Sequence, residues 1–243
     1  MLKHTTYDEF HKEAIVQKKV ISDKNFTYRN ILGILKKELT EEKLKILDYG
    51  CGVGTIDFYL AHLGHSITGI DISPKAIRVC KSSAKEIGVA SNTTFKLISQ
   101  RLDNEYDLII CSELIEHVPD DIKLLEKLTI LLKKGGKLLI STPTVDAPLY
   151  KLNLAKDFDI RVGHLRRYVP NELIEKVTSQ LGLKIIQVKR SEGILRNSLF
   201  IFPSLNWIIK FLKGPLSDLV TFIDDALVII FGESNIFIVA QKL

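Results

Sequence analysis

The stretch Leu47-Asp48-Tyr49-Gly50-Cys51-Gly52-Val53-Gly54 decides the fold of this chain. An apolar run that includes Leu44 and Ile46 ends there at an acid and three alternate glycines. Glycine takes positive φ at no cost and has no side chain, so such a turn lets backbone N–H groups approach a ligand. The residues from Thr55 to Leu63 then predict a helix, whose N-terminus presents further donors. We interpret the stretch as a ligand-binding turn between a strand and a helix, rather than a tight turn without a ligand.

Composition indicates an ordinary globular protein. The chain has 243 residues, of which 46% are hydrophobic and 26% charged, which suits one large domain or a domain with an embellishment. The three cysteines show no C-x-x-C spacing, so we expect a reducing compartment. The residues up to Val20 include acids and lysines, whereas a secretory signal peptide has an apolar core there. No uninterrupted apolar run has the length of a membrane span. These features predict a cytoplasmic protein without a transmembrane span.

The positive charge is unevenly placed. Between Arg161 and Arg196 there are eight basic residues and three acids, an excess that equals the net charge of +5. Such a cluster is either a solvated face or a site for an anionic substrate group or a phosphate backbone.

Strands and helices alternate around the glycine turn. Two helices, Tyr7 to Val20 and Thr27 to Leu39, are expected before the first strand. A second strand, Ser66 to Ile70, ends at Asp71, and a helix follows from Pro74 to about Glu86. This alternation predicts a parallel sheet. An acid at the end of the second strand either binds the two hydroxyls of a ribose, as in such folds, or merely caps the next helix.

The glycine spacing separates two classes of nucleotide-binding protein. Dinucleotide oxidoreductases use G-x-G-x-x-G, whereas this chain reads G-x-G-x-G and has Thr55 where the third small residue is needed. The turn instead resembles the first motif of class I S-adenosylmethionine-dependent methyltransferases. Further strands that match this family are Thr94 to Ile98, Tyr106 to Cys111 and Gly136 to Ser141, and the resemblance covers about residues 44 to 142.

The resemblance implies a fold and a cofactor. The fold is α/β, a Rossmann-like seven-stranded, mostly parallel sheet with helices on both faces, whose last strand is Asn235 to Gln241. The cofactor is S-adenosylmethionine, with Asp71 on the ribose. Gln100 stands where many relatives place an acid, and its amide oxygen is the candidate acceptor for the adenine amino group. The expected cofactor-binding residues are Asp48, Gly50, Cys51, Gly52, Gly54, Asp71, Ile72, Gln100 and Ser112.

The segment after the fourth strand, Cys-Ser-Glu-Leu-Ile-Glu-His-Val, bears on the chemistry. It lacks the (Asp/Asn)-Pro-Pro-(Tyr/Phe) motif of amine and amide methyltransferases and the Pro-Cys of cytosine-C5 enzymes. Glu113, Glu116 and His117 are spaced to share one face of a helical turn, where they suit a divalent cation, and His164 is the candidate fourth ligand. The E-x-x-E-H motif is similar to the one with which small-RNA 2′-O-methyltransferases bind Mg²⁺, and ubiquinone-pathway O-methyltransferases resemble it there.

The resemblance leaves a second interpretation of the motif open. Without a metal, His117 acts as a general base beside Glu116, or it only lines the pocket.

The phrase "GHLRRYVPNEL" resembles a substrate-side segment of many small-molecule methyltransferases. A helix from Pro170 to about Leu181 and a sixth strand, Leu183 to Val188, are expected at and after its end. Its arginines either hold a carboxylate or phosphate, or pair with Asp157 and Asp159. The candidate substrate-binding residues are His164, Arg166, Arg167 and Tyr168.

The chain is expected to consist of an N-terminal helical cap (1–43) and a methyltransferase domain (44–192 and 234–243). A helical-hairpin insertion (193–233) interrupts this domain before its last strand. Gly214-Pro215 joins its two helices. The second helix has an apolar face opposite a polar one. The apolar residues are Leu216, Leu219, Val220, Ile223, Leu227 and Ile230, and the polar ones are Ser217, Asp218, Thr221, Asp224 and Asp225. The hairpin packs on the domain or at a dimer interface, or it covers a long hydrophobic acceptor.

The sequence thus predicts O-methylation of a small or lipid-like acceptor, prenylated or anionic, with peripheral membrane contact as an option and the oligomeric state open. One alternative is an RNA 2′-O-methyltransferase with a divalent metal. Another is a non-catalytic, cofactor-binding scaffold subunit.

Overall fold

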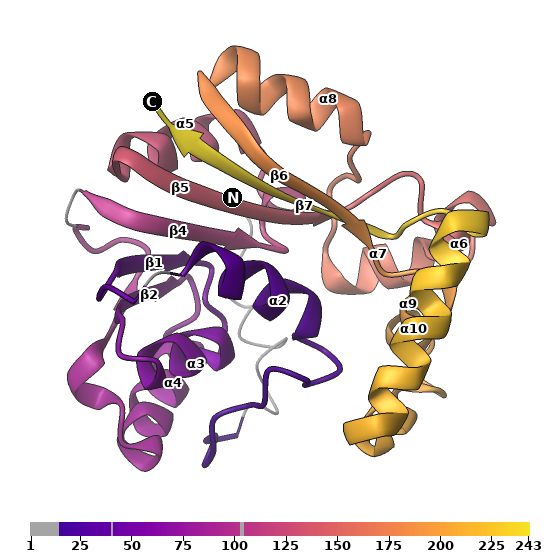
Figure 1. The fold of residues 1–243 in the computed structure, drawn as a ribbon, viewed down its shortest axis with the longest axis horizontal. Coiled ribbons are helices and arrows are strands. Elements are labelled where there is room, and N and C mark those ends of the chain that lie inside the picture. Colours follow the sequence, from indigo (N-terminus) through magenta and orange to yellow (C-terminus); the bar gives the residue numbers. More distant parts are fainter. Residues whose placement is uncertain (1–14, 40, 103–104) are drawn as a thin grey trace.

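A seven-stranded sheet forms the centre of the computed structural model, which describes residues 15–39, 41–102 and 105–243 (Figure 1). The strand order is β3-β2-β1-β4-β5-β7-β6, and only β7 runs antiparallel to its neighbours. The strands are β1 Lys45–Tyr49, β2 Ser66–Asp71, β3 Thr93–Leu97, β4 Tyr106–Ser112, β5 Leu132–Pro143, β6 Leu183–Ser191 and β7 Asn235–Lys242. The predicted Rossmann-like sheet is confirmed.

Helices cover both faces of this sheet, as predicted. The main ones are α2 Arg29–Glu38, α3 Thr55–His62, α4 Pro74–Ile87, α5 Asp121–Leu131 and α8 Pro170–Glu175. α5 and α8 bury apolar residues against one face, and α2, α3 and α4 against the other. Short segments complete the domain: α6 Pro148–Lys151, α7 Lys156–Val162, the 3-10 turns η1 Ala90–Asn92 and η2 Ile115–His117, and a π-helical turn η3 Lys176–Gln180.

The first predicted helix is wrong over the part that the structure describes. Residues 15–20 form no helix, and the rest of the predicted Tyr7 to Val20 lies outside the described residues. Gln17 instead crosses the start of α3: its backbone N–H donates to Ser83 Oγ at 2.9 Å, and its amide oxygen accepts from Thr55 Oγ1 at 3.1 Å. These tertiary hydrogen bonds replace those of a helix and place the segment beside the glycine turn.

The insertion differs from the predicted hairpin. It contains α9 Ile194–Ile201, which was not predicted, a 3-10 helix η4 Asn206–Phe211 in place of the first α-helical arm, and α10 Gly214–Phe231. α10 also presents the opposite face to the domain. Ser217, Thr221 and Asp224 are buried, whereas most of the apolar stripe is exposed. The expectation that this stripe packs on the domain is therefore wrong.

A helix cap explains the orientation of α10. The Asp224 carboxylate accepts backbone N–H bonds from Gly193 at 2.8 Å, Leu195 at 2.9 Å and Arg196 at 3.1 Å, at the start of α9. Unpaired N–H groups at a helix start need acceptors, and a carboxylate is a strong one. Satisfying them turns the polar stripe of α10 inward.

Replacing Asp224 by alanine should cost about 1–3 kcal/mol of unfolding free energy, because three N–H donors, two of them in buried hydrogen bonds, lose their acceptor. Urea unfolding measures this loss. The neighbouring Asp225→Ala is the control, since Asp225 is exposed and should change stability by less than about 0.5 kcal/mol. Equal losses in the two variants would contradict the cap.

Candidate active site

The glycine turn connects β1 to α3 and is fixed to the end of β2. Gly50 donates its N–H to Ile70 O at 2.8 Å, and Gly52 donates to Asp71 Oδ2 at 2.9 Å. Gly50, Gly52 and Gly54 have φ of 90°, 54° and 79°. This left-handed backbone is strained for other residues, so the turn depends on glycine. It places the turn at the carboxyl edge of the sheet, where parallel α/β folds bind ligands.

Two acids lie beside the turn. Asp71 also accepts from Ser73 N at 2.8 Å, while Ser73, not Asp71, caps α4 by accepting from Ala76 N. Asp48 is almost fully buried; burial, and then the charge of Asp71, raise its pKa to about 7. A ligand that brings hydroxyl donors and positive charge would stabilise this pair as carboxylates.

The remaining predicted cofactor-binding residues differ in their burial and in their position relative to the glycine turn. Cys51 and Ile72 are half-buried near the turn, and Ser112 Oγ lies 2.8 Å from Ser141 Oγ at the ends of β4 and β5. Gln100 is exposed, and its amide oxygen accepts from Leu97 N at 3.0 Å. The adenine contact of Gln100 stays a prediction and would require that oxygen to accept a second bond.

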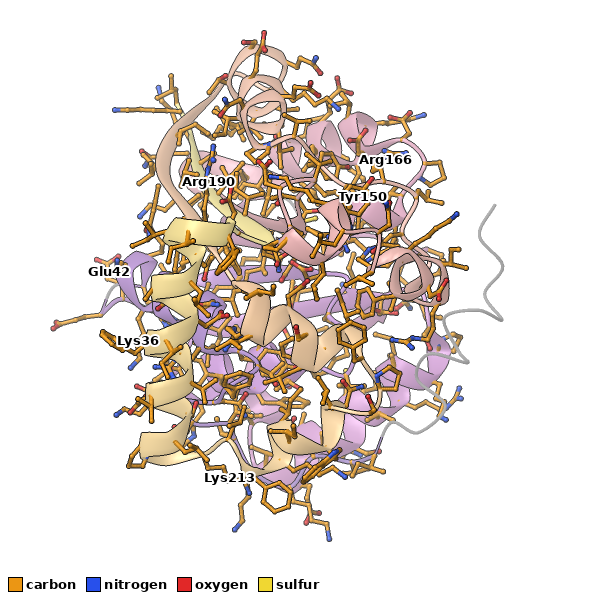
Figure 2. All side chains as sticks on the ribbon, turned by 90° about the vertical axis from the view of Figure 1, so that its right-hand side faces the viewer. Lys36, Glu42, Tyr150, Arg166, Arg190 and Lys213 are labelled. Carbon is orange, nitrogen blue, oxygen red and sulfur yellow. The ribbon has the colours of Figure 1, made fainter. Side chains whose placement is uncertain are left out.

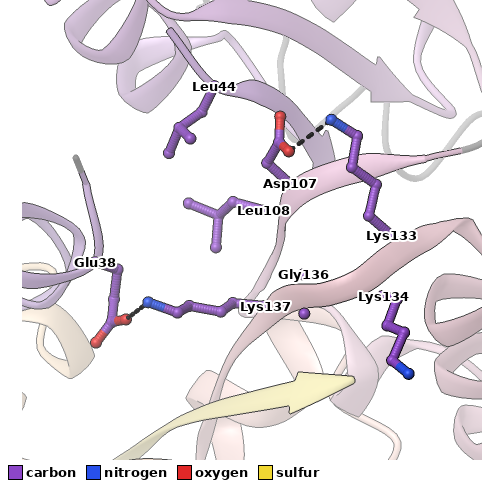
Figure 3. A pocket seen from close by; sticks show the side chains of 9 residues that line it. Glu38, Leu44, Asp107, Leu108, Lys133, Lys134, Gly136 and Lys137 are labelled. Atoms are coloured by element: carbon purple, nitrogen blue, oxygen red, sulfur yellow. Dashed lines mark hydrogen bonds and ion pairs between the residues drawn. The ribbon is translucent and has the colours of Figure 1, made fainter. Parts of the chain in front are cut away.

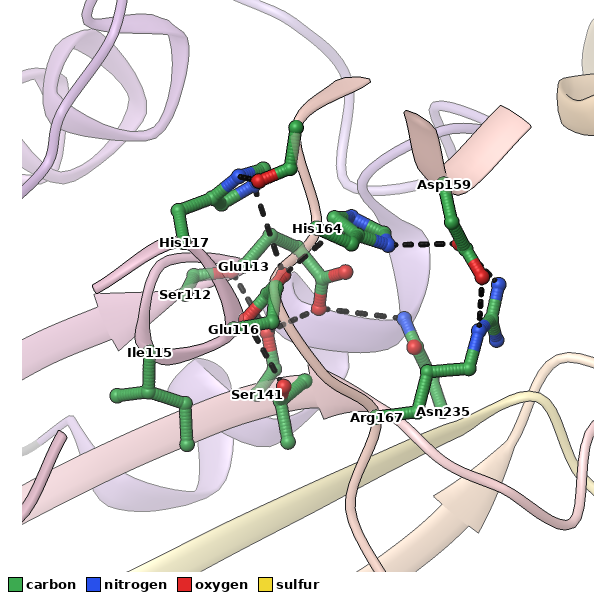
Figure 4. A network of polar contacts seen from close by, with 12 residues as sticks. Ser112, Glu113, Ile115, Glu116, His117, Ser141, Asp159, His164, Arg167 and Asn235 are labelled. Atoms are coloured by element: carbon green, nitrogen blue, oxygen red, sulfur yellow. Dashed lines mark hydrogen bonds and ion pairs between the residues drawn. The ribbon is translucent and has the colours of Figure 1, made fainter. Parts of the chain in front are cut away.

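A buried carboxylate oxygen faces two histidines at the end of β4 (Figure 4). Glu116, on η2, accepts from Thr142 Oγ1 at 2.8 Å with Oε2. Its Oε1 has no hydrogen-bond partner among the described residues and lies 3.9 Å from Nε2 of both His117 and His164. One ligand atom from each of these three residues lies within 4.8 Å of the others.

The outer nitrogens of both histidines are already engaged. His117 Nδ1 lies 3.1 Å from Gly163 O, a carbonyl that can only accept, so Nδ1 carries the proton. His164 Nδ1 lies 2.8 Å from Asp159 Oδ1, and it likewise donates its proton to that carboxylate oxygen. Burial, and then the neighbouring His164, lower the pKa of His117 to about 4, so it is neutral near pH 7. The neutral ring of His117 therefore turns the lone pair of Nε2 toward Glu116, and His164 also points its Nε2 atom at the same carboxylate oxygen.

The two predicted substrate arginines make contacts within the chain. Arg167 forms a bidentate pair with Asp159, at 2.7 and 2.8 Å, which is one of the two expected alternatives. Arg166 lies 3.2 Å from Asp121, and Tyr168 is buried with its hydroxyl donating to the same carboxylate at 2.8 Å. Burial raises the pKa of Asp159, but hydrogen bonds from His164 and Arg167 outweigh it and hold this pKa below its ordinary value. Arg167 thus keeps Asp159 ionised as the acceptor for His164.

Glu113 is separate from the cluster formed by Glu116, His117 and His164. Its φ of 50° turns the side chain toward Ser141 Oγ, at 2.7 Å, and Asn235 Nδ2, at 3.2 Å. Burial, and then the charge of Glu192, raise its pKa to about 7. The structure thus brings together three of the four predicted metal ligands.

The cofactor turn and the cluster adjoin each other. A Cβ added to Gly50 would lie 3.0 Å from Leu114 Cδ2, in the segment between Glu113 and Glu116. A ligand in the glycine turn and an acceptor beside the cluster would therefore be neighbours.

Several supporting residues have only weak signals in the sequence. Thr142 follows the predicted fifth strand and Asn235 begins the last one. Polar residues at such strand ends could have been included among the candidate site residues. Nothing in the spacing identifies the Gly163 carbonyl, and Asp159 was considered only as a partner for arginine.

A surface pocket at the other edge of the sheet carries no catalytic constellation (Figure 3). It lies near the starts of β4 and β5, and four of its five charged side chains are paired, Lys137 with Glu38 at 2.8 Å and Lys133 with Asp107 at 2.7 Å; the fifth is Lys134. We therefore assign the candidate site to the opposite, carboxyl edge.

Asp57, on α3, is fully buried, and neither carboxylate oxygen has a hydrogen-bond partner among the residues described. Burial, and then the charge of Asp48, raise its pKa well above the ordinary value. The folded state therefore keeps a proton that the unfolded state releases, and stability falls as the pH rises from about 4 toward the folded-state pKa.

Asp57→Asn removes this titration. Its unfolding free energy relative to wild type should grow by up to about 1.4 kcal/mol per pH unit over that window. Urea unfolding at two pH values inside the window measures the difference. The same difference at both values would show that Asp57 is ionised when folded.

The sheet order, the G-x-G-x-G turn and the acid at the end of β2 define a class I S-adenosylmethionine-dependent methyltransferase domain. A model of the family described as "Methyltransferase domain" matches residues 40–187. The chain belongs to this family.

Curated relatives match over part of their length. The chain is 33% identical over 114 residues to the ubiquinone biosynthesis O-methyltransferase of Xylella fastidiosa, covering 46% of each chain. It is 36% identical over 101 residues to that of Cupriavidus pinatubonensis, covering 40% of this chain and 41% of the relative. The chain thus spans about half the length of the curated relatives it matches.

Solved structures share the fold at low identity. Phosphoethanolamine N-methyltransferase 2 of Haemonchus contortus superposes with a TM-score of 0.64 at 19% identity, covering 98% of this chain and 56% of the other. Magnesium protoporphyrin IX methyltransferase of Synechocystis gives 0.60 at 19% identity, covering 89% and 82%. These similarities show the fold and leave the acceptor open.

Proposed function

We propose that the protein methylates a hydroxyl oxygen of a small or lipid-like acceptor, at a divalent cation held by Glu116, His117 and His164. One observation carries the proposal: Glu116 Oε1, buried and without a hydrogen-bond partner among the described residues, faces the Nε2 atoms of His117 and His164. A carboxylate oxygen and the lone pair of the neutral His117 ring repel each other unless a proton or a cation lies between them.

The chemistry of the donor set fits a cation. Two imidazoles and one carboxylate suit Mn²⁺, Fe²⁺, Co²⁺ or Zn²⁺ better than Mg²⁺, which prefers oxygen ligands. Hydrogen bonds from ligand histidines to carboxylates or carbonyls are usual around bound metals, and Asp159 and Gly163 supply them here. A bound cation would lower the pKa of an acceptor hydroxyl.

The chain's own residues position the reactants. Asp159 and Gly163 fix the two imidazoles, Thr142 holds Glu116, and the glycine turn with Asp71 would hold the cofactor, which supplies an electrophilic methyl group. Methyl transfer breaks the sulfur–carbon bond of the donor, forms a carbon–oxygen bond and releases the hydroxyl proton. Alignment of the acceptor oxygen with the methyl group contributes most to the rate.

Two further observations support a small acceptor over RNA. The relatives named above are O-methyltransferases of ubiquinone biosynthesis. Much of the basic segment is occupied within the chain: Arg167 pairs with Asp159, Arg190 with Glu233, and Arg196 with Glu192.

Cys51, Cys80 and Cys111 are free thiols, so the cytoplasm remains our proposed compartment.

The test follows a labelled methyl group from S-adenosylmethionine into the lipid, aqueous small-molecule and RNA fractions of a cell lysate. We expect label in the lipid or small-molecule fraction. Chelator should abolish this labelling by the wild-type protein, and added Mn²⁺ should restore it. His164→Ala should give no label. His62→Ala is the matched control, because His62 is exposed on α3. Label confined to RNA would replace the proposed acceptor class. Cofactor binding without label in any fraction would indicate a scaffold subunit.

A further inference from the structure

We propose that the outer face of η4 and α10 docks on an anionic lipid bilayer. This outer face consists of large apolar side chains whose exposed fractions run from 41% at Ile223 to 87% at Ile229. Its members are Trp207, Phe211, Leu216, Leu219, Phe222, Ile223, Ile229, Ile230 and Phe231. Monomeric proteins rarely expose so many neighbouring apolar side chains without a partner surface.

The α10 members form a continuous stripe. Leu216, Leu219, Ile223 and Ile230 recur at three-, four- and seven-residue steps, so they lie along one side of the helix. The 18 residues of α10 extend over about 27 Å. α10 stands at the edge of the molecule, with the sheet on its other side (Figures 1 and 2).

Two of the three acids of α10 are engaged within the chain. Asp218 pairs with Arg29 at 3.0 Å and with Lys24 at 3.2 Å, and Asp224 caps α9 from a buried position. Asp225 is exposed, and its spacing puts it beside Phe222 and Ile229 at the border of the outer face. In the sequence the polar faces of the insertion are not rich in lysine, which weakens the case for membrane binding, whereas the structure turns Asp218 and Asp224 toward basic and N–H groups.

Two lysines border the outer face. Lys210 and Lys213 are exposed and form no ion pair with any residue in the described ranges. Lys213 projects away from the molecule at the start of α10 (Figure 2). Anionic headgroups above an apolar layer complement this pattern, as they do for amphipathic helices that lie in the membrane interface.

The proposed contact is peripheral. Within the described residues, no helix combines the length and the apolarity that crossing a membrane requires. α10 would instead lie in the plane of the interface, with Trp207 and Phe211 at its edge, whose rings contact each other at a centroid distance of 5.7 Å.

The single tryptophan of the chain, Trp207, lies on the outer face and provides the probe. Full-length protein is mixed with vesicles of phosphatidylcholine alone or with phosphatidylglycerol added. We expect flotation with the anionic vesicles, a blue shift of tryptophan emission, and quenching by lipids brominated in the acyl chain. Unchanged emission and no flotation would overturn the proposal.

Matched variants separate the apolar contribution to vesicle binding from the electrostatic contribution of the two lysines. Ile229→Ser with Ile230→Ser should weaken vesicle binding by at least about tenfold, since both side chains would insert. Ile130→Ser, at a comparably exposed site on α5, is the apolar control. Lys210→Glu with Lys213→Glu should remove the preference for phosphatidylglycerol, while Lys81→Glu with Lys85→Glu, exposed on α4, should keep most of it.

These results are independent of the proposed function, because all variants should bind S-adenosylmethionine as wild type does. A tryptophan blue shift that depends on protein concentration without vesicles, and that Ile229→Ser with Ile230→Ser abolishes, would identify an interface between two copies and overturn the lipid assignment.

Discussion

Glu116→Gln should abolish cation binding and lower methyl transfer at least about a hundredfold, because it removes the only carboxylate of the cluster that Glu116 forms with His117 and His164. In chelator, however, the same variant should be as stable as wild type or more stable. Burial, and then the charge of Glu113, raise the pKa of Glu116 well above its ordinary value, so the carboxyl destabilises the cation-free protein as the pH rises.

Thermal unfolding with chelator and with Mn²⁺ measures both effects. Wild type should gain about 2.7 kcal/mol at a cation concentration a hundredfold above Kd, and Glu116→Gln should gain nothing. Glu126→Gln, exposed on α5, is the control for loss of one charge and should behave as wild type. An equal gain in wild type and Glu116→Gln would show that the cation binds elsewhere.

Gly54→Ala should lower the affinity for S-adenosylmethionine about a hundredfold or more. Gly54 has φ of 79° and is the N-cap of α3, and a Cβ there would lie 2.9 Å from Phe58 Cζ and 3.1 Å from Cys80 Sγ. Both neighbours are buried in the core, so the turn would have to shift, and its N–H groups would lose their placement for the ligand. Calorimetric titration with the cofactor measures the loss.

Gly64→Ala provides the matched control. Gly64 has φ of 97°, but no atom lies within 4 Å of an added Cβ. This variant should therefore show only the backbone cost of a left-handed residue, about 1–2 kcal/mol of stability, with unchanged cofactor affinity. Equal affinity losses in the two variants would mean that the effect comes from reduced stability and not from the glycine turn.

Local patterns predicted the sheet well because they are repeated along the chain. Each buried parallel strand reads as an apolar run, and the turns after β1 and β2 carry glycine or an acid. The helix predicted over residues 7–20 failed over its described part, since Gln17 finds hydrogen-bond partners on Ser83 and Thr55, which no local pattern reveals. The π-helical turn η3, at the end of the helix expected from Pro170, was equally hidden.

The candidate site was predicted in its residue types but not in its pairings. The motif placed Glu113, Glu116 and His117 on one face, whereas Glu113 has a positive φ and bonds to Ser141 and Asn235. Ion pairing of Arg167 with Asp159 was one of two open alternatives. Spacing along the chain fixes which residues are near one another only within a turn or two of a helix.

The sequence by itself determined the methyltransferase fold and the expected cofactor turn, because glycine spacing and strand periodicity are local properties of the backbone. Tertiary structure decided the rest. It brought His164 to Glu116 and His117, from segments almost fifty residues apart, and its hydrogen bonds to the two Nδ1 atoms orient both imidazoles with Nε2 inward. It also rotated α10: three N–H groups at the start of α9 required the carboxylate of Asp224, and meeting that requirement left the apolar stripe outside.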